Sequence, residues 1–318
     1  MRPNSTSTVI RPDLGALLYE FLHSPKDFVM PLVLPIFPTP SQNGQYPVIP
    51  KEAFLKIPSH MARAARSAYY RDDIAFETKD YATEDRGLEI PLDDTEKRMY
   101  GNLFVAEQVI ADSIASKMLR KHELAGSTLL TNTSTFDNAA AAYKWNLSAD
   151  ADPRADVQAR INNIRDNTGT ICDTVVMAET SFQDVVNCAA FIEQCKYTKA
   201  VQLLPREEQI ALVAAYLGVK KLRIVTAVYD ASKKPNSSTI TDIWTNTKIM
   251  VCKTADNPLN LKEPCVGRTF LWEEDSPEML VMEMYREEKI RSDVYRGRGY
   301  MMEKVVAADL GNIITGVR

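Results

Sequence analysis

The stretch Asp94–Gly126, DTEKRMYGNLFVAEQVIADSIASKMLRKHELAG, carries the strongest periodic signal of the chain and decides the fold. Asp93 followed three residues later by Glu96 is typical of a helix N-terminal capping box, and Gly126 is a stop signal. We therefore predict one helix from about Asp94 to about Ala125, on the order of 45 Å long at 1.5 Å per residue, which makes it a spine. Its apolar stripe recurs at steps of three and four residues: Met99, Leu103, Ala106, Ile110, Ile114 and Met118.

Residues 1–58 precede this spine and are rich in proline, which removes backbone donors and fixes φ. A compact domain is not expected here. The apolar run around Leu32, Leu34, Ile36 and Phe37 is nevertheless too apolar for a solvated linker. We predict an extended arm that lies on another surface, and we treat these four residues as candidate intersubunit contacts.

Residues 59–93 show near-alternation of apolar and polar residues on either side of a charged centre, which favours a two-stranded hairpin with its tip within 79–87. An isolated hairpin is marginally stable, so a partner is implied. The candidate contacts are its aromatic and charged residues: Tyr69, Tyr70, Phe76, Tyr81, Glu84, Asp85 and Arg86.

Beyond the spine, helix and strand signals alternate from about Asp150 to Asp230. Helices are expected from Pro153 to Gly169, from Phe182 to Cys195 and from Pro205 to Leu217, with buried strands at 172–177 and 222–228. This order indicates an α/β domain. Residues 248–318 return to strand character, and the charged strands near 283–298 carry three further candidate contacts, Arg286, Glu288 and Arg291.

Composition sets limits on function. The chain has 318 residues, 45% of them hydrophobic, and a formal net charge of -4, so it has no basic excess for gripping nucleic acid. Its five cysteines form no C-x-x-C pair and are expected to be buried and reduced, as in a reducing compartment. No apolar run is long enough for a signal peptide or a membrane span.

A catalytic site is not apparent. The three histidines, His23, His60 and His122, are far apart, and no metalloprotease, nucleophile-elbow or glycine-rich phosphate motif occurs. Asp152 and Asp156, with Asp150, lie close enough for a metal site, but helix capping explains Asp152 more simply. We expect no catalytic residues, no cofactor and no metal.

The order of these parts resembles the capsid fold of tailed bacteriophages, often called the Hong Kong-type or Johnson fold. The text from Met61 to Ile110 is similar to one branch of phage major capsid proteins, through Tyr69-Tyr70 and Gly87-Leu88-Glu89-Ile90-Pro91-Leu92 before the spine. Further segments that stand where that branch has like ones are Ala149-Asp150-Ala151-Asp152-Pro153, Asp173-Thr174-Val175-Val176-Met177, Tyr216-Leu217-Gly218-Val219 and Arg291-Ser292-Asp293.

The resemblance implies an α+β major capsid fold. Its parts would be an N-terminal arm at 1–58, an extended loop at 59–93, a peripheral domain at 94–130 and 270–304 that contains the long spine helix, and an α/β axial domain at 131–269 and 305–318.

The resemblance also implies the function of a non-enzymatic structural protein. Hexamers and pentamers of the chain would build an icosahedral shell in the bacterial host cytoplasm, enclose double-stranded DNA without specific binding, and remain in the virion, with no membrane. Separate scaffolding, portal and decoration proteins would be partners. Two alternatives stay open: a cargo-enclosing nanocompartment of the same fold, and a soluble α/β enzyme with an unrecognised site.

Overall fold

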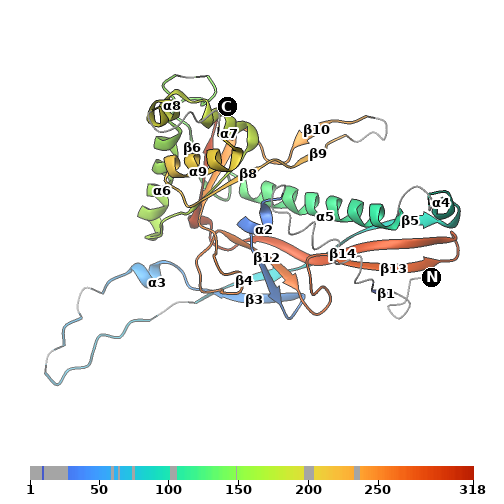
Figure 1. The fold of residues 1–318 in the computed structure, drawn as a ribbon. Coiled ribbons are helices and arrows are strands. Elements are labelled where there is room, and N and C mark those ends of the chain that lie inside the picture. Colours follow the sequence, from blue (N-terminus) through green and yellow to red (C-terminus); the bar gives the residue numbers. More distant parts are fainter. Residues whose placement is uncertain are drawn as a thin grey trace.

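A computed structural model of the chain describes residues 9–10, 28–58, 61–63, 65–73, 76–100, 106–147, 149–196, 204–232 and 237–318. Figure 1 shows three parts: a long, flat layer that carries helix α5, a sheet flanked by helices above one end of that layer, and a strip of chain that projects from the same end. The fold class is α+β, as predicted.

The flat layer is a six-stranded sheet with the order β1-β13-β14-β12-β2, in which β5 pairs with the other edge of β14. Its strands are β1 (Val9–Ile10), β2 (Ile36–Thr39), β5 (Glu84–Asp93), β12 (Gly267–Trp272), β13 (Val281–Glu287) and β14 (Ser292–Val305). Helix α5 (Ala106–Leu130) lies along this sheet (Figure 1), and its buried Ile114 packs with Leu92 and Tyr295. The layer is therefore held by a core between one helix and one sheet.

The upper part is a five-stranded sheet with the order β6-β15-β11-β7-β8. Its strands are β6 (Asp137–Ala140), β7 (Thr174–Ala178), β8 (Lys221–Val225), β11 (Lys248–Cys252) and β15 (Gly311–Thr315). Its helices are α6 (Pro153–Thr168), α7 (Glu179–Val186), α8 (Ala189–Cys195), α9 (Arg206–Leu217) and the short 3-10 helix η3 (Ala308–Leu310). Every residue of β7 is buried, as expected for a central strand covered on both faces.

Local signals place two of these helices correctly. The Asp152 carboxylate accepts hydrogen bonds from the Arg154 and Ala155 amides at the start of α6, and Gly169 ends it with φ 71°. Gly218, with φ 73°, ends α9 in the same way. The predicted helix from 182 to 195 is instead two helices, because the chain turns at Asn187 between α7 and α8.

Along the predicted spine the structure describes two helices, α4 (Asp94–Tyr100) and α5; residues 101–105 between them, with Leu103 of the expected stripe, lie outside the described residues. Met99 of the stripe is exposed, and the C-terminal end differs from its prediction. Gly126 does not stop α5, which continues to Leu130. A Cβ atom at Gly126 would lie 2.5 Å from Sδ of Met30, so the glycine makes room for that side chain rather than ending the helix. The predicted pairing of Asp93 with Glu96 is confirmed: the Asp93 amide donates to Glu96 Oε2 at 3.4 Å, while Asp93 Oδ1 accepts the Thr95 amide at 2.7 Å.

The predicted hairpin is wrong. Strand β4 (Glu77–Ala82) pairs with β3 (Asn43–Val48) from the N-terminal region, whereas β5 pairs with β14 over ten residues. Strand β5 pairs with the long edge of β14 rather than with the neighbouring strand β4. What projects is the described part of the chain between β3 and β4, which begins with helix α3 (Glu52–Leu55) (Figure 1). We call the described residues within 49–76 the projecting segment.

The N-terminal region is also less independent than predicted. Short helix α2 (Met30–Val33) inserts Met30, Val33 and Leu34 into the core of its own subunit, where all three are fully buried. The buried Glu123 carboxylate on α5 accepts the backbone amides of Val29 and Met30 at 3.0 and 2.9 Å. Leu34 is therefore corrected from an intersubunit contact to a core residue.

A second small ribbon, β9 (Val228–Asp230) with β10 (Ile240–Asp242), extends from the upper part and runs above α5 in Figure 1. Arg120 of α5 donates from Nε to the Val228 carbonyl at 3.1 Å, which fixes the root of the ribbon on the spine.

Candidate assembly surfaces

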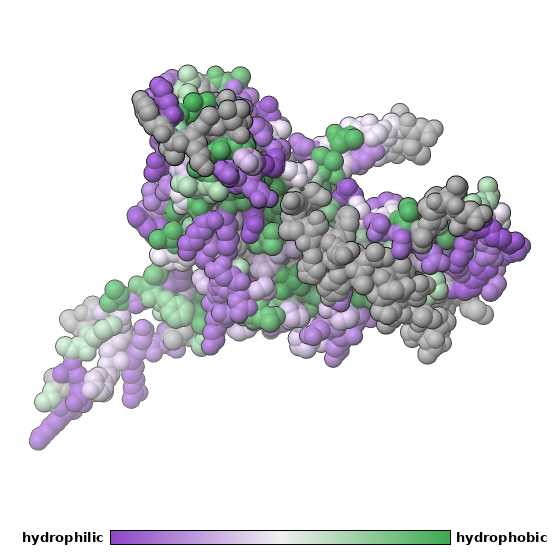
Figure 2. Space-filling model, in the orientation of Figure 1, coloured by the Kyte–Doolittle hydropathy of each residue, from purple (hydrophilic) through white to green (hydrophobic). Residues whose placement is uncertain are grey.

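The projecting segment exposes a dense group of large apolar side chains. Among the residues that the structure describes, twenty large hydrophobic side chains are exposed, and eight of them lie on this segment: Ile49, Phe54, Leu55, Ile57, Met61, Tyr69, Tyr70 and Phe76. Figure 2 shows apolar surface near the root of the segment and a polar end. Exposed apolar side chains gathered in this way are typical of a surface that contacts another molecule.

The segment also carries positive charge. Residues 49–76 contain five lysines and arginines against three aspartates and glutamates, in a chain of net charge -4. Arg63 lies 4.7 Å from the centre of the Tyr69 ring and donates to the Ser67 carbonyl at 3.1 Å. These contacts shape the end of the segment locally, but they do not cover its apolar side chains.

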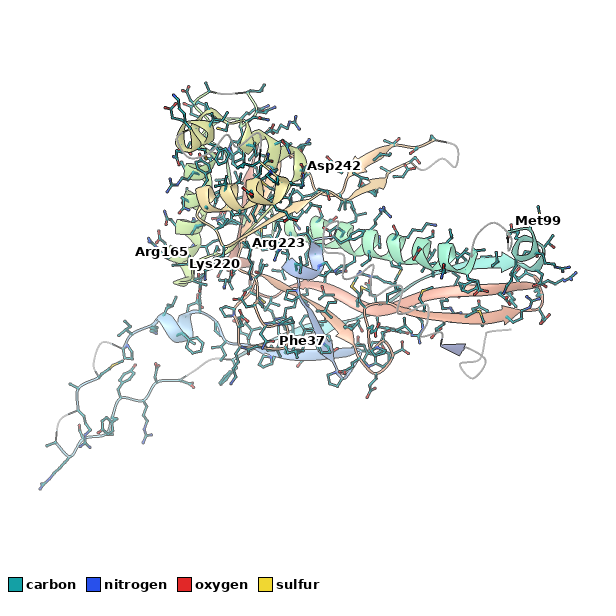
Figure 3. All side chains as sticks on the ribbon, in the orientation of Figure 1. Phe37, Met99, Arg165, Lys220, Arg223 and Asp242 are labelled. Atoms are coloured by element: carbon teal, nitrogen blue, oxygen red, sulfur yellow. The ribbon has the colours of Figure 1, made fainter. Side chains whose placement is uncertain are left out.

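The root of the segment, in contrast, is an internal aromatic core. The ring of Tyr81 stacks on Phe270 with 5.0 Å between ring centres and 12° between planes, and Tyr46 and Phe37 pack on the same ring. Figure 3 places Phe37 at this root, beside β3 and β4. Tyr81 and Phe37 thus contact their own subunit, and the expectation that Tyr81 faces a neighbour is wrong because Phe270 buries it.

Arg86, another predicted contact, also serves its own subunit. Its guanidinium donates to both Glu303 oxygens at 2.9 Å, and His122 Nδ1 lies 2.6 Å from Glu303 Oε1. Burial raises the pKa of Glu303, but the hydrogen bond with His122 and the attraction of His122 and Arg86 outweigh it and lower the pKa to about 2. This ionised carboxylate ties β5, α5 and β14 together.

At the far end of the layer, Arg286 holds both oxygens of Asp94 at 2.6 and 2.7 Å and Asp293 at 3.2 Å. It therefore closes the end of its own subunit, where Figure 3 also places Met99.

Glu288 and Arg291, in the turn between β13 and β14, are exposed. The other predicted contacts on the surface are Leu32, Tyr69, Tyr70, Phe76, Glu84 and Asp85, while Ile36 is half-buried.

Sequence reasoning missed the contribution of Phe54, Leu55 and Ile57, which are 71%, 53% and 82% exposed. They lie between Pro50 and Pro58 in a stretch assigned to the arm. An apolar cluster bracketed by prolines is the signal that could have identified them.

No metal centre is evident within the described ranges: no group of three or more His, Cys, Asp or Glu side chains is arranged to hold an ion. Asp156 instead accepts the Trp145 indole N–H at 2.9 Å.

The five cysteines are free, and burial raises the pKa of Cys172 to about 12. His23 and His60 lie outside the described residues. None of the helices placed by the structure is long and apolar enough to cross a membrane.

Comparison with known proteins identifies the fold. The sequence matches no family model and no curated protein. The structure, however, resembles a phage-related protein from Bordetella bronchiseptica RB50, with 18% identity, a TM-score of 0.74 and 98% of each chain covered. It also resembles a virus-like particle from Pyrococcus furiosus (6% identity, TM-score 0.60, 95% of this chain and 98% of that one). The capsid of cyanophage P-SCSP1u gives 10% identity and a TM-score of 0.56, with 88% and 85% covered. The chain therefore has the fold of tailed-phage major capsid proteins.

Proposed function

We propose that the chain is the major capsid protein of a tailed bacteriophage, whose copies self-assemble into an icosahedral shell around double-stranded DNA. The observation that carries the proposal is the projecting segment, which takes eight large apolar side chains away from the body of its own subunit. In a closed assembly of identical copies, each segment meets the same surface on the next copy, so every exposed strip is covered. The shared fold supports the same conclusion.

The parts of the shell subunit follow from this proposal. Residues 1–58 would form the arm, 59–93 the extended loop, 94–130 with 270–304 the peripheral domain, and 131–269 with 305–318 the axial domain. Hexamers and pentamers would lie in the virion after assembly in the host cytoplasm. Scaffolding, portal and decoration proteins would be separate partners.

The proposed contacts between copies are the exposed members of the predicted set together with the apolar side chains that the structure adds. They are Leu32, Phe54, Leu55, Ile57, Tyr69, Tyr70, Phe76, Glu84, Asp85, Glu288 and Arg291. The enclosed DNA would be contained rather than gripped, because a chain of net charge -4 cannot release many counterions. This arrangement gives the protein a structural role rather than a catalytic one.

A cargo-enclosing nanocompartment is the second candidate. The chain shares its fold with a virus-like particle from Pyrococcus furiosus, at a TM-score of 0.60, as well as with a phage capsid, so the fold alone does not fix what a shell encloses. Both candidates share the shell and differ in its content.

The test is to express the chain, image it by electron microscopy, and analyse what purified particles hold. We expect closed particles with pentameric and hexameric units. For a phage head, particles from infected or induced cells should contain double-stranded DNA, whereas a co-purifying enzyme in place of DNA would support the nanocompartment. A protein that stays monomeric would refute both.

A further inference from the structure

The loop between β11 and β12, residues 256–265, has an unusual combination of internal order and outward apolar side chains. We call it the stapled loop. Arg268, at the start of β12, is almost fully buried and donates to the backbone carbonyls of Pro258, of Asn260 at 2.5 Å and of Glu263 at 3.4 Å. A buried guanidinium with these partners fixes the course of the loop backbone.

A second set of bonds closes the same loop from within. The Glu263 carboxylate accepts the amides of Asp256 at 2.7 Å and Asn257 at 2.9 Å, and these bonds lower the pKa of Glu263. The side chains of Asn257 and Asn260 accept the amides of Leu259 and Lys262, each at 3.1 Å. Most amides of residues 256–263 are thus bonded within the loop, which has a defined conformation without an outside partner.

This defined conformation leaves two leucines in solvent. Leu259 is 66% exposed and Leu261 is 50% exposed. Folding has already imposed the order that a flexible loop would have to acquire on docking, so covering these leucines gains apolar burial at little entropic cost. The stapled loop therefore presents a preformed apolar knob.

We infer that Leu259 and Leu261 dock on a second copy of this chain, an inference that rests on the proposed shell. Two leucines offer only a small part of the roughly 800 Å² that each partner buries in a stable pairwise complex. They cannot recruit a free partner alone, but they add to a larger interface that is repeated by symmetry.

The position of the knob agrees with such an interface. The Arg268 guanidinium lies 5.8 Å from the centre of the Phe37 ring, and Phe37 packs on Phe270 at the root of the projecting segment. The stapled loop therefore lies beside the root of the projecting segment. A second copy that packs against this root would be placed beside the knob.

The inference is tested with the full chain, by placing a photoreactive amino acid at position 259 or 261 and irradiating purified protein. Ile171, which is 67% exposed, is the matched control position, in the loop between α6 and β7. Covalent dimers should form at 259 and 261 and outnumber those at 171. In a parallel arm, Leu259→Ser with Leu261→Ser should raise the protein concentration needed for assembly about tenfold, with the melting temperature of the unassembled subunit unchanged.

The outcomes distinguish failure of the docking inference from failure of the proposed shell. Particles that form normally in the double variant, with no dimers at either position, would overturn the inference and leave the shell standing. Concentration-dependent dimers through 259 and 261 without particles would support the knob and refute the shell. Neither dimers nor particles would refute both.

Preorganisation has its own test. Glu263→Gln removes the charge that holds the Asp256 and Asn257 amides and leaves both leucines in place. We expect faster hydrogen exchange at these two amides and a higher concentration for assembly. Faster exchange with unchanged assembly would show that the rigidity of the loop does not contribute to docking.

Discussion

Two aromatic residues near the root of the projecting segment differ in burial: Tyr81 belongs to the core of the subunit, and Phe76 lies on its surface. Tyr81 is 8% exposed and stacks on Phe270, so Tyr81→Ser removes most of a buried ring and should lower the free energy of unfolding by about 3 kcal/mol. Phe76 is 69% exposed, so Phe76→Ser should change that free energy by less than about 0.5 kcal/mol. Both variants should lower the yield of particles, for different reasons.

The assay pairs thermal unfolding of the unassembled subunit with particle yield by sedimentation. Tyr81→Ser should melt several degrees below the wild type and assemble poorly, while Phe76→Ser should melt normally and assemble poorly. Tyr81→Phe is the control, because it keeps the ring and loses only the contact of the hydroxyl group with Ser41 at 3.2 Å. Equal loss of melting temperature in both serine variants, or normal particles from Phe76→Ser, would refute this division.

Three further predictions concern the joints of the subunit. Gly126→Ala should destabilise the subunit by about 1–3 kcal/mol, because the new methyl group meets the buried Met30, and adding Met30→Ala should recover part of this loss in denaturant unfolding. The pKa of Glu303 is lower in the folded state, so its contribution of about 3 kcal/mol is complete well above pH 4.5 and is lost as the pH falls toward 2. Glu303→Gln should remove this part of the pH dependence of unfolding, and an unchanged dependence would count against an ionised carboxylate at this position. Glu123→Ala should leave two buried amides without an acceptor and cost about 1–3 kcal/mol for each, with faster hydrogen exchange at residues 29 and 30 as the sign that α2 has come loose.

The sequence predicted those elements whose limits are set by nearby residues. Helix α6 begins at the Asp152 cap and ends at Gly169, and both signals act within one turn. The pairing of β5 could not be predicted in this way, because its partner β14 lies about 200 residues further along the chain. Gly126 shows the same limit: only the position of Met30 reveals that this glycine accommodates a side chain.

Some candidate contacts are core residues and others are surface residues, and distant parts of the chain again decide which. Alternation indicated a strand around Phe76, which lies directly before β4, but it assigned Tyr81 to the hairpin tip, whereas Tyr81 lies in β4. It also could not show which of the two is covered, since the covering ring belongs to distant Phe270. Apolar composition alone likewise could not separate Leu34, which enters its own core, from Leu32, which remains partly exposed. Tertiary packing decides between a core residue and a contact between copies.

The mass of the purified wild-type chain in solution, measured by sedimentation velocity over a range of concentrations, tests the central claim most directly. Self-assembly into a shell predicts particles in the megadalton range above a threshold concentration, in equilibrium with subunits or capsomers below it. A single species at 35.7 kDa, or a small ring that does not grow with concentration, would contradict it.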